Sequence, residues 1–143
     1  MSLHTISAAD AIARLSAFSA VIDARSEDEF AEDHLPGAVN WPSLVNAERA
    51  EVGTLYKQVN PFEAKKRGAA LVAANIARHI QREVIDQPRD WQPLVYCWRG
   101  GKRSGAMAHI LREIGWEAKT LEGGYRAWLE AGDPVARKEE GKP

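Results

Sequence analysis

The chain has 143 residues, of which 45% are hydrophobic, and this is enough for one globular domain with its own core. The formal net charge is -1, so the composition gives no general attraction to nucleic acid or to a membrane, and no apolar run approaches the length of a membrane span. A single cysteine excludes an internal disulfide, a CxxC pair and a cysteine-rich zinc site, and we expect a lone free thiol in the reducing cytoplasm.

Short apolar runs alternate with helical patterns in the first half of the chain. Ser7 is a predicted helix cap, and Ser26 with Glu29 forms a capping-box pattern. In chain order we predict an edge strand at 4–7, a helix over 8–15, a buried strand at 20–23, a helix over 27–34, and a turn with a short strand within 35–42.

The second half begins with two helical patterns. One helix is predicted from Asn46, and Asn60 caps a longer helix that starts at Pro61. After them we predict a strand at 94–97, a helix from Gly101 or Lys102 to Gly115, a strand with a turn in 117–124, and a helix over 125–132. The side chains predicted to face the core are Val72, Ile76, Ile80 and Val84 on the long helix and Met107, Ile110, Leu111 and Ile114 on the later one.

This alternation of strands and helices predicts an α/β fold with a central, mainly parallel five-stranded sheet flanked by helices. We expect residues 1–134 to form a single domain and residues 135–143 to be a polar, flexible tail.

The cysteine lies in the stretch "LVYCWRGGKRSG", which also contains two adjacent glycines and three cationic residues. Cys97 ends an apolar strand, and ligands of open α/β sheets bind beyond that end. Gly100 and Gly101 permit a tight loop whose backbone N–H groups converge on one point, and the next helix directs its N-terminus there. The loop also carries three cations: Arg99, Lys102 and Arg103.

No carboxylate occurs from Gln92 through Arg112, so this local charge favours a thiolate and attracts an anion. We interpret Cys97 as a nucleophile that attacks an anionic substrate. The alternative is that Cys97 is a small buried hydrophobic residue and that the cations form an ordinary solvated helix start.

Three motifs together resemble the rhodanese family of sulfurtransferases. They are "VIDARSEDEFAEDHLPGAVN", the loop "VYCWRGGKRS" and the ending "LEGGYRAWLEAGDPV", in the family's order and over nearly the whole chain. The resemblance implies a rhodanese-like three-layer fold. It also implies that Cys97 takes a sulfane sulfur from a small anionic donor such as thiosulfate, holds it as a persulfide, and passes it to a thiol or cyanide-like acceptor, with no metal or cofactor.

The resemblance also assigns roles to the residues around the cysteine. Asp23 and His34 are expected to be structural, and the side chain of Trp98 either forms a pocket wall or covers the loop. Arg25 either reaches the substrate or pairs with an acid, and we favour the pairing. The residues expected to bind substrate are Trp98, Arg99, Gly100, Gly101, Lys102, Arg103, Ser104 and Arg25.

Two departures from most rhodaneses leave alternatives open. Cysteine, five residues, arginine and serine is also the pattern of cysteine phosphatases, and the Cdc25-type phosphatases share the rhodanese fold. In that alternative Arg103 would clamp a phosphoryl group, but Tyr96 stands where such phosphatases usually carry histidine.

The long middle segment and the loop are similar to the rhodanese domain of tRNA 2-selenouridine synthase. That family exchanges sulfur for selenium in tRNA and carries a second domain with a GxxxxGK[ST] loop, which is absent from these residues, so we do not expect a nucleic-acid partner from this domain alone. The cations of the long helix, among them Lys65, Lys66 and Arg67, are read as a charged outer face. A catalytically silent interaction module is the last alternative.

Overall fold

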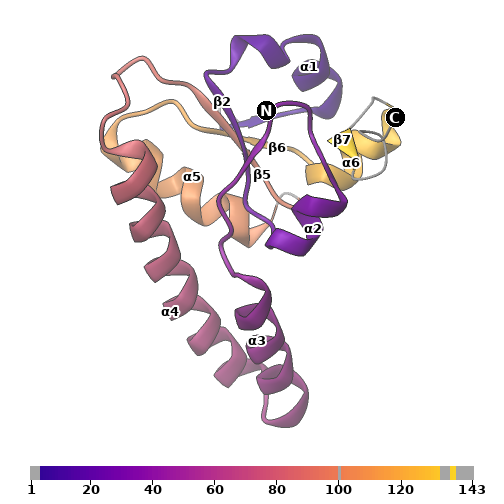
Figure 1. The fold of residues 1–143 in the computed structure, drawn as a ribbon, viewed down its shortest axis with the longest axis vertical. Helices are drawn as coiled ribbons and strands as arrows, with labels where there is room; N and C mark the ends of the chain where they lie inside the picture. The colour runs from indigo at the N-terminus through magenta and orange to yellow at the C-terminus, as the bar shows by residue number, and fades with distance from the viewer. Residues whose placement is uncertain (1–3, 100, 133–135, 138–143) are drawn as a thin grey trace.

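The centre of the molecule is a five-stranded sheet, described here by a computed structural model that covers residues 4–99, 101–132 and 136–137. The strand order is β1-β6-β5-β2-β4, and every neighbouring pair is parallel. The strands are β1 (Thr5–Ile6), β2 (Ala20–Asp23), β4 (Val39–Asn40), β5 (Pro93–Tyr96) and β6 (Lys119–Leu121). The predicted fold class is therefore confirmed (Figure 1).

Six helices and two short helical turns connect and cover these strands in the described part of the chain. They are α1 (Ala8–Ala13), η1 (Leu15–Ala17), α2 (Glu27–Glu32), α3 (Asn46–Gln58), α4 (Pro61–His79), η2 (Ile80–Val84), α5 (Lys102–Ile114) and α6 (Gly124–Glu130). The sequence patterns placed the ends of α1 and α2 too late, because the chain turns into η1 after the first helix and into strand β3 after the second.

A second, two-stranded antiparallel sheet joins β3 (Asp33–His34) to β7 (Ala136–Arg137), and no sequence pattern predicted it. This pairing brings two residues of the expected tail back to the body of the domain. The remaining residues of that tail, 135 and 138–143, lie outside the described residues.

The residues predicted to cap the helices are found at the helix N-termini. The Ser7 hydroxyl accepts from the N–H of Asp10 at 3.2 Å, and the Asn60 side chain accepts from the N–H of Glu63 at 2.8 Å. Ser26 and Glu29 form the predicted capping box, in which the Ser26 N–H donates to Glu29 Oε1 at 3.0 Å. These bonds satisfy donors that a helix N-terminus otherwise leaves unpaired, so local sequence fixes where each helix begins.

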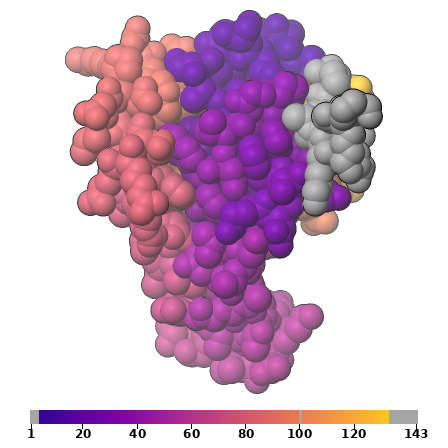
Figure 2. Space-filling view, viewed as in Figure 1, coloured from indigo at the N-terminus to yellow at the C-terminus, as the bar shows by residue number. Residues whose placement is uncertain are grey.

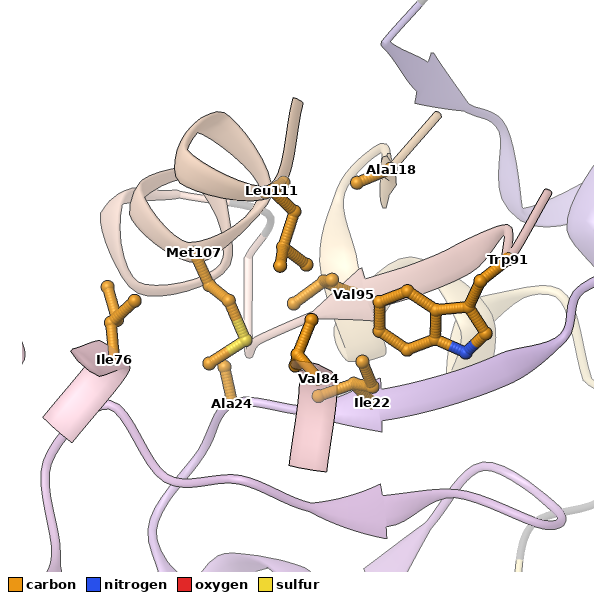
Figure 3. Close-up of a cluster of buried hydrophobic side chains, with 10 residues drawn as sticks. Ile22, Ala24, Ile76, Val84, Trp91, Val95, Met107, Leu111 and Ala118 are labelled. Atoms are coloured by element: carbon orange, nitrogen blue, oxygen red, sulfur yellow. The ribbon is translucent and has the colours of Figure 1, made fainter. Parts of the chain in front are cut away.

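Each face of the sheet packs against its own hydrophobic cluster, which gives the three-layer arrangement. Side chains of α1 and α6 cover one face, and those of α4, η2 and α5 cover the other. Figure 3 shows the second cluster, in which Met107 of α5 points toward Ala24 and Leu111 of α5 points toward Val95 of β5. Alternate residues of β5 enter different clusters, because successive strand side chains point to opposite faces.

One predicted core position is wrong. Ile114 was expected to face inward with Met107 and Leu111, yet its side chain is 53% exposed, whereas the other two are buried. The chain turns at Gly115, with φ of 130°, immediately after Ile114, and Leu111 is the last fully buried side chain of the helix. A helical repeat predicts a face but cannot say where the sheet beneath it ends.

Helices α3 and α4 form a hairpin that projects from the sheet domain (Figures 1 and 2). Among the described residues, α3 has no fully buried side chain. Helix α4 buries Ala64 near its start, but it joins the hydrophobic cluster on the sheet only through Val72 and Ile76 in its second half. Tyr56, Val59 and Phe62 near the tip are each more than half exposed. Within the described ranges, no helix combines the length and the apolar character that crossing a membrane requires.

Candidate active site at the end of strand β5

Cys97 directly follows β5, and its side chain is nearly fully buried. Its Sγ lies 3.2 Å from the Oγ of Ser104, in the first turn of α5, which begins at Lys102 after Gly101. The predicted helix start beside the cysteine is therefore confirmed. The thiol lies beside a helix N-terminus, where the helix dipole favours negative charge.

The start of α6 fixes the beginning of the cysteine loop. The Tyr125 N–H donates to the carbonyl of Cys97 at 2.9 Å, and the Arg126 N–H donates to that of Trp98 at 3.0 Å. Gly123 and Gly124 make this approach possible, since both have positive φ, of 73° and 63°. The double glycine of the ending "LEGGYRAW" is thus a backbone requirement that positions the loop.

A buried charge pair lies behind the loop. Arg25 Nη2 donates to Asp23 Oδ2 at 2.8 Å, and its Nε contacts both carboxylate oxygens at 3.1 Å. Tyr96 OH donates to the same Asp23 oxygen at 2.7 Å and accepts from the Leu35 N–H at 3.1 Å. The Arg25 side chain is only 4% exposed and lies 4.3 Å from the ring centre of Tyr125.

This geometry matches the pairing that we favoured for Arg25 and the anchoring role expected of Asp23. Burial alone would lower the pKa of Arg25, but the hydrogen bond and charge of Asp23 outweigh it and raise that pKa. Burial and the Asp23 charge raise the pKa of Tyr96, so its hydroxyl stays protonated and donates. The contacts of Tyr96 with Asp23 and of Tyr125 with Arg25 were not predicted, because these partners are far apart in the sequence and no local pattern indicates them.

Arg103 contacts an acid that the local sequence lacks. Its Nη1 lies 3.1 Å from Oε1 of Glu29 in α2, and Arg49 of α3 contacts the same oxygen at 2.9 Å. Burial alone would raise the pKa of Glu29, but the Ser26 N–H and the two guanidinium groups lower it below the ordinary value. Residues 92–112 contain no carboxylate of their own, but the tertiary structure brings the Glu29 carboxylate into contact with Arg103.

The other predicted site residues differ in exposure. Arg99 and Lys102 are exposed, and the half-buried Trp98 ring lies 6.2 Å from that of Tyr125. His34 Nδ1 hydrogen-bonds the Phe30 carbonyl at 2.8 Å, and its ring stacks on that of Phe30 at 3.8 Å. Gly100 lies outside the described residues, so the predicted N–H cradle stays a prediction. In the described part of the chain, no group of three or more His, Cys, Asp or Glu is arranged to hold a metal ion.

The comparison with protein families agrees with this geometry. The model of the rhodanese-like domain matches residues 7–131. The chain belongs to the rhodanese-like family. A rhodanese-like domain places it in the sulfurtransferase superfamily, with the single cysteine after β5 at the centre of the candidate site.

Named relatives show which rhodanese-like proteins this chain is similar to. It is 38% identical over 121 residues to the tRNA 2-selenouridine synthase of Nitrosomonas europaea, and 37% identical over 130 residues to that of Proteus mirabilis. These matches cover 82% and 89% of this chain but only 31% and 35% of the two synthases, so the chain spans about a third of their length.

A solved structure is also similar over nearly its full length. It is the N-terminal domain of a protein from Clostridium difficile 630 that is described as ATP/GTP binding, with a TM-score of 0.74 and 32% identity. The match covers 91% of this chain and 99% of that domain. The rhodanese-like unit seen here therefore corresponds to a whole domain of that structure.

Proposed function

We propose that the chain is a sulfurtransferase that carries a sulfane sulfur as a persulfide on Cys97. The observation that carries this proposal is the position of the thiol, buried after β5 with Sγ 3.2 Å from Ser104 Oγ at the start of α5. A hydroxyl and a helix N-terminus both stabilise a sulfur anion. We also infer a reducing, cytoplasmic compartment, in which this thiol stays free.

The proposed transfer has two steps. The Cys97 thiolate attacks the outer sulfur of a thiosulfate-type donor, a new S–S bond forms, the donor's S–S bond breaks, and sulfite leaves with the electron pair. A thiolate or cyanide acceptor then attacks the outer sulfur of the persulfide, and the Cys97 thiolate leaves. No second cysteine, metal or organic cofactor is required by these steps.

The surrounding residues take different parts in this proposal. Arg99 and Lys102, which are exposed, attract the donor's charge, and the N–H groups of Gly100 and Gly101 cradle it. Ser104 donates its hydroxyl to Sγ, and Trp98 forms the wall beside the thiol. Arg103 adds positive charge from its position against Glu29. Asp23, Arg25 and His34 hold the structure behind the loop.

Intact-protein mass spectrometry after incubation with thiosulfate tests the proposal directly. We expect the wild type to gain one sulfur and to lose it when cyanide is added. The Cys97→Ser variant should gain none while unfolding at the same urea concentration, since a hydroxyl is similar in size but a far poorer nucleophile at neutral pH. Sulfur gain in Cys97→Ser would end the proposal.

A second candidate function is selenium transfer, and the similarity to the tRNA 2-selenouridine synthases favours it. The chain would then be the chalcogen-carrying domain of a larger activity. Selenosulfate in place of thiosulfate should load one selenium on Cys97 in the same assay, because the thiolate attacks the selenium, the Se–S bond breaks, and sulfite leaves with the electron pair. Loading from selenosulfate but not from thiosulfate would place this candidate first.

The phosphatase alternative gains no support from the arginine that it requires. The Arg103 guanidinium, which would clamp a phosphoryl group, contacts Glu29. An aryl phosphate belongs in the same series of assays, and Cys97-dependent release of phosphate would move this alternative to first place.

A further inference from the structure

Ser43 is a fully buried serine in the segment that follows strand β4. Its N–H donates to the Ala24 carbonyl, directly after β2, at 3.0 Å, and its hydroxyl donates to the Arg103 carbonyl in the first turn of α5 at 3.2 Å. Its own carbonyl accepts from Asn75 Nδ2 of α4 at 2.8 Å. One residue therefore connects the end of a strand with two helices from distant parts of the chain.

The bond between Ser43 and Ala24 leads to the strand that carries the thiol. The Ala24 N–H donates to the Tyr96 carbonyl at 2.8 Å, so the backbone that Ser43 contacts is itself bonded to the end of β5. Cys97 is the next residue, and its side chain is nearly fully buried. Two backbone hydrogen bonds thus fix Ser43 relative to the residue that precedes the thiol.

The bond between Ser43 and Arg103 leads to the hydroxyl that contacts the thiol. A helical carbonyl accepts from the N–H four residues later and keeps a second lone pair for another donor. The Ser43 hydroxyl is such a donor for Arg103. The next residue, Ser104, is fully buried, with its Oγ 3.2 Å from Cys97 Sγ. Ser43 therefore holds the helical turn that carries this hydroxyl.

The Ser104 hydroxyl has a single proton, and a carbonyl competes with sulfur for it. The Gly101 carbonyl lies 3.4 Å from Ser104 Oγ, compared with 3.2 Å for Cys97 Sγ. Gly101 belongs to the same helix start, so a displacement of this turn away from Cys97 lengthens only the contact with sulfur. The position of the turn therefore decides which acceptor receives the proton.

The Glu29 carboxylate also contacts Arg103, but it does so through Nη1 at the end of a long side chain. That guanidinium can keep its partner while the backbone of the turn moves. Ser43 contacts the backbone itself, so its hydrogen bond restricts the turn more directly.

We propose that Ser43 is a positioning residue of the sulfur-transfer site and acts on Cys97 through Ser104. Its hydroxyl holds the first turn of α5 at the distance from β5 at which Ser104 donates to the sulfur. This donated bond stabilises the thiolate, which is the attacking form. The inference rests on the proposed function for its effect on sulfur loading, whereas its effect on the thiolate requires no transfer.

Titration of the thiolate by its ultraviolet absorbance tests this role without any sulfur donor. The chain has a single cysteine, so the signal belongs to Cys97. The titration midpoint should rise by about half a pH unit in Ser43→Ala, because a hydrogen bond to charged sulfur is lengthened, and by about one unit or more in Ser104→Ala, because it is lost. An unchanged midpoint in either variant would overturn the inference.

The double variant Ser43→Ala/Ser104→Ala distinguishes positioning from a general loosening of the site. Ser43→Ala should have no further effect once the Ser104 hydroxyl is absent, because the two residues act through one contact. Additive shifts would contradict the inference.

Ser19→Ala is the matched control for the loss of a serine hydroxyl. The Ser19 hydroxyl accepts from the Gln92 N–H at 2.9 Å, just before β5 and therefore at the end of that strand opposite to Cys97. This variant should leave the midpoint unchanged. A shift equal to that of Ser43→Ala would show that the effect does not depend on the position of Ser43.

Asn75→Ala provides the second test if urea unfolding shows that Ser43→Ala does not fold. It removes the donor to the Ser43 carbonyl and leaves the Ser43 hydroxyl in place. The midpoint should again rise, by less than about half a unit, and it should not rise further in the Ser104→Ala background. An unchanged midpoint in Asn75→Ala would then overturn the inference.

Sulfur loading separates this inference from the proposed function. Below the titration midpoint, Ser43→Ala should lower the loading rate at saturating thiosulfate about threefold, which corresponds to half a pH unit. The half-saturating concentration should stay the same, because the exposed Arg99 and Lys102 remain to attract the donor. A change in half-saturation alone would contradict the role in thiolate stabilisation. Absence of any persulfide would end the proposed function, while the thiolate titration would still decide whether Ser43 positions Ser104.

Discussion

At the scale of single residues, Glu29 connects three helices through one carboxylate. It caps its own helix α2 through the Ser26 N–H at 3.0 Å, and it accepts from Arg49 of α3 and Arg103 of α5. The pKa of Glu29 is lowered by these donors despite burial. The ionised form therefore stabilises the folded state, and the site depends on it because Arg103 belongs to the candidate loop.

We expect Glu29→Gln to lower the free energy of unfolding at neutral pH by about 1–2 kcal/mol, since hydrogen bonds to a charged group are lost. Because the folded pKa lies below the ordinary value of 4.5, the contribution is complete above that pH and disappears as the pH falls below it. Urea unfolding of both proteins between neutral and acidic pH measures this convergence.

The exposed Glu32 of the same helix provides the control for this experiment. Glu32→Gln should change the free energy of unfolding by less than about 0.5 kcal/mol at any pH. Parallel curves for the wild type and Glu29→Gln would contradict the assigned role of the carboxylate.

At the scale of elements, the junction between β6 and α6 controls the cysteine loop. Gly123 has φ of 73°, and an added Cβ would lie 2.7 Å from the Cβ of Ala127. This left-handed turn, which glycine adopts without strain, directs the N–H groups of Tyr125 and Arg126 to the carbonyls of Cys97 and Trp98. The turn therefore links a local backbone conformation to the position of the thiol.

Gly123→Ala should lower the free energy of unfolding by about 2 kcal/mol or more, because a left-handed conformation is costly for alanine and the Cβ collides with α6. Sulfur loading on Cys97 should also slow, since α6 must shift. The urea midpoint and the rate of mass gain measure the two effects.

The matched control is Gly53→Ala in α3, where the backbone is helical and an added Cβ meets nothing within 4 Å. It should raise the free energy of unfolding by about 1 kcal/mol through helix propensity. Equal effects of the two substitutions would mean that the turn at Gly123 accommodates a Cβ.

At the scale of the whole molecule, the sheet domain and the α3–α4 hairpin differ in how they are held. The sheet has a hydrophobic cluster on each face, whereas the hairpin projects from the sheet domain (Figures 1 and 2). Tyr56, Val59 and Phe62 near its tip are exposed. The His79 side chain ties the end of α4 to the body through the Pro42 carbonyl at 2.7 Å. The hairpin is therefore expected to open separately from the core.

Hydrogen exchange followed by mass spectrometry should detect this difference. Peptides from α3 should exchange faster than those from β5 and α5, because local opening is easiest where few side chains are buried. Equal protection of α3 and β5 in the isolated chain would contradict separate opening and indicate that another surface covers the hairpin.

The sequence by itself determined the features that depend on neighbours in the chain. Helix caps at Ser7 and Asn60, the apolar strand before Cys97 and the helix after it follow from local hydrogen bonding and from the periodicity of apolar residues. The order of the three motifs indicated the family, and the alternation of strands and helices predicted the parallel sheet. Cys97 could therefore be identified as the candidate nucleophile from the sequence alone.

Only the tertiary structure decided which side chains meet across the molecule. Glu29 and Arg103 are 74 positions apart and Asp23 and Tyr96 are 73 positions apart, and no local pattern encodes such contacts. The exposure of Ile114 and the pairing of β3 with β7 depend equally on where distant elements end. Contacts between distant residues depend on how the whole chain packs. The charged groups and the side chains that surround Cys97 could therefore be identified only from the tertiary structure.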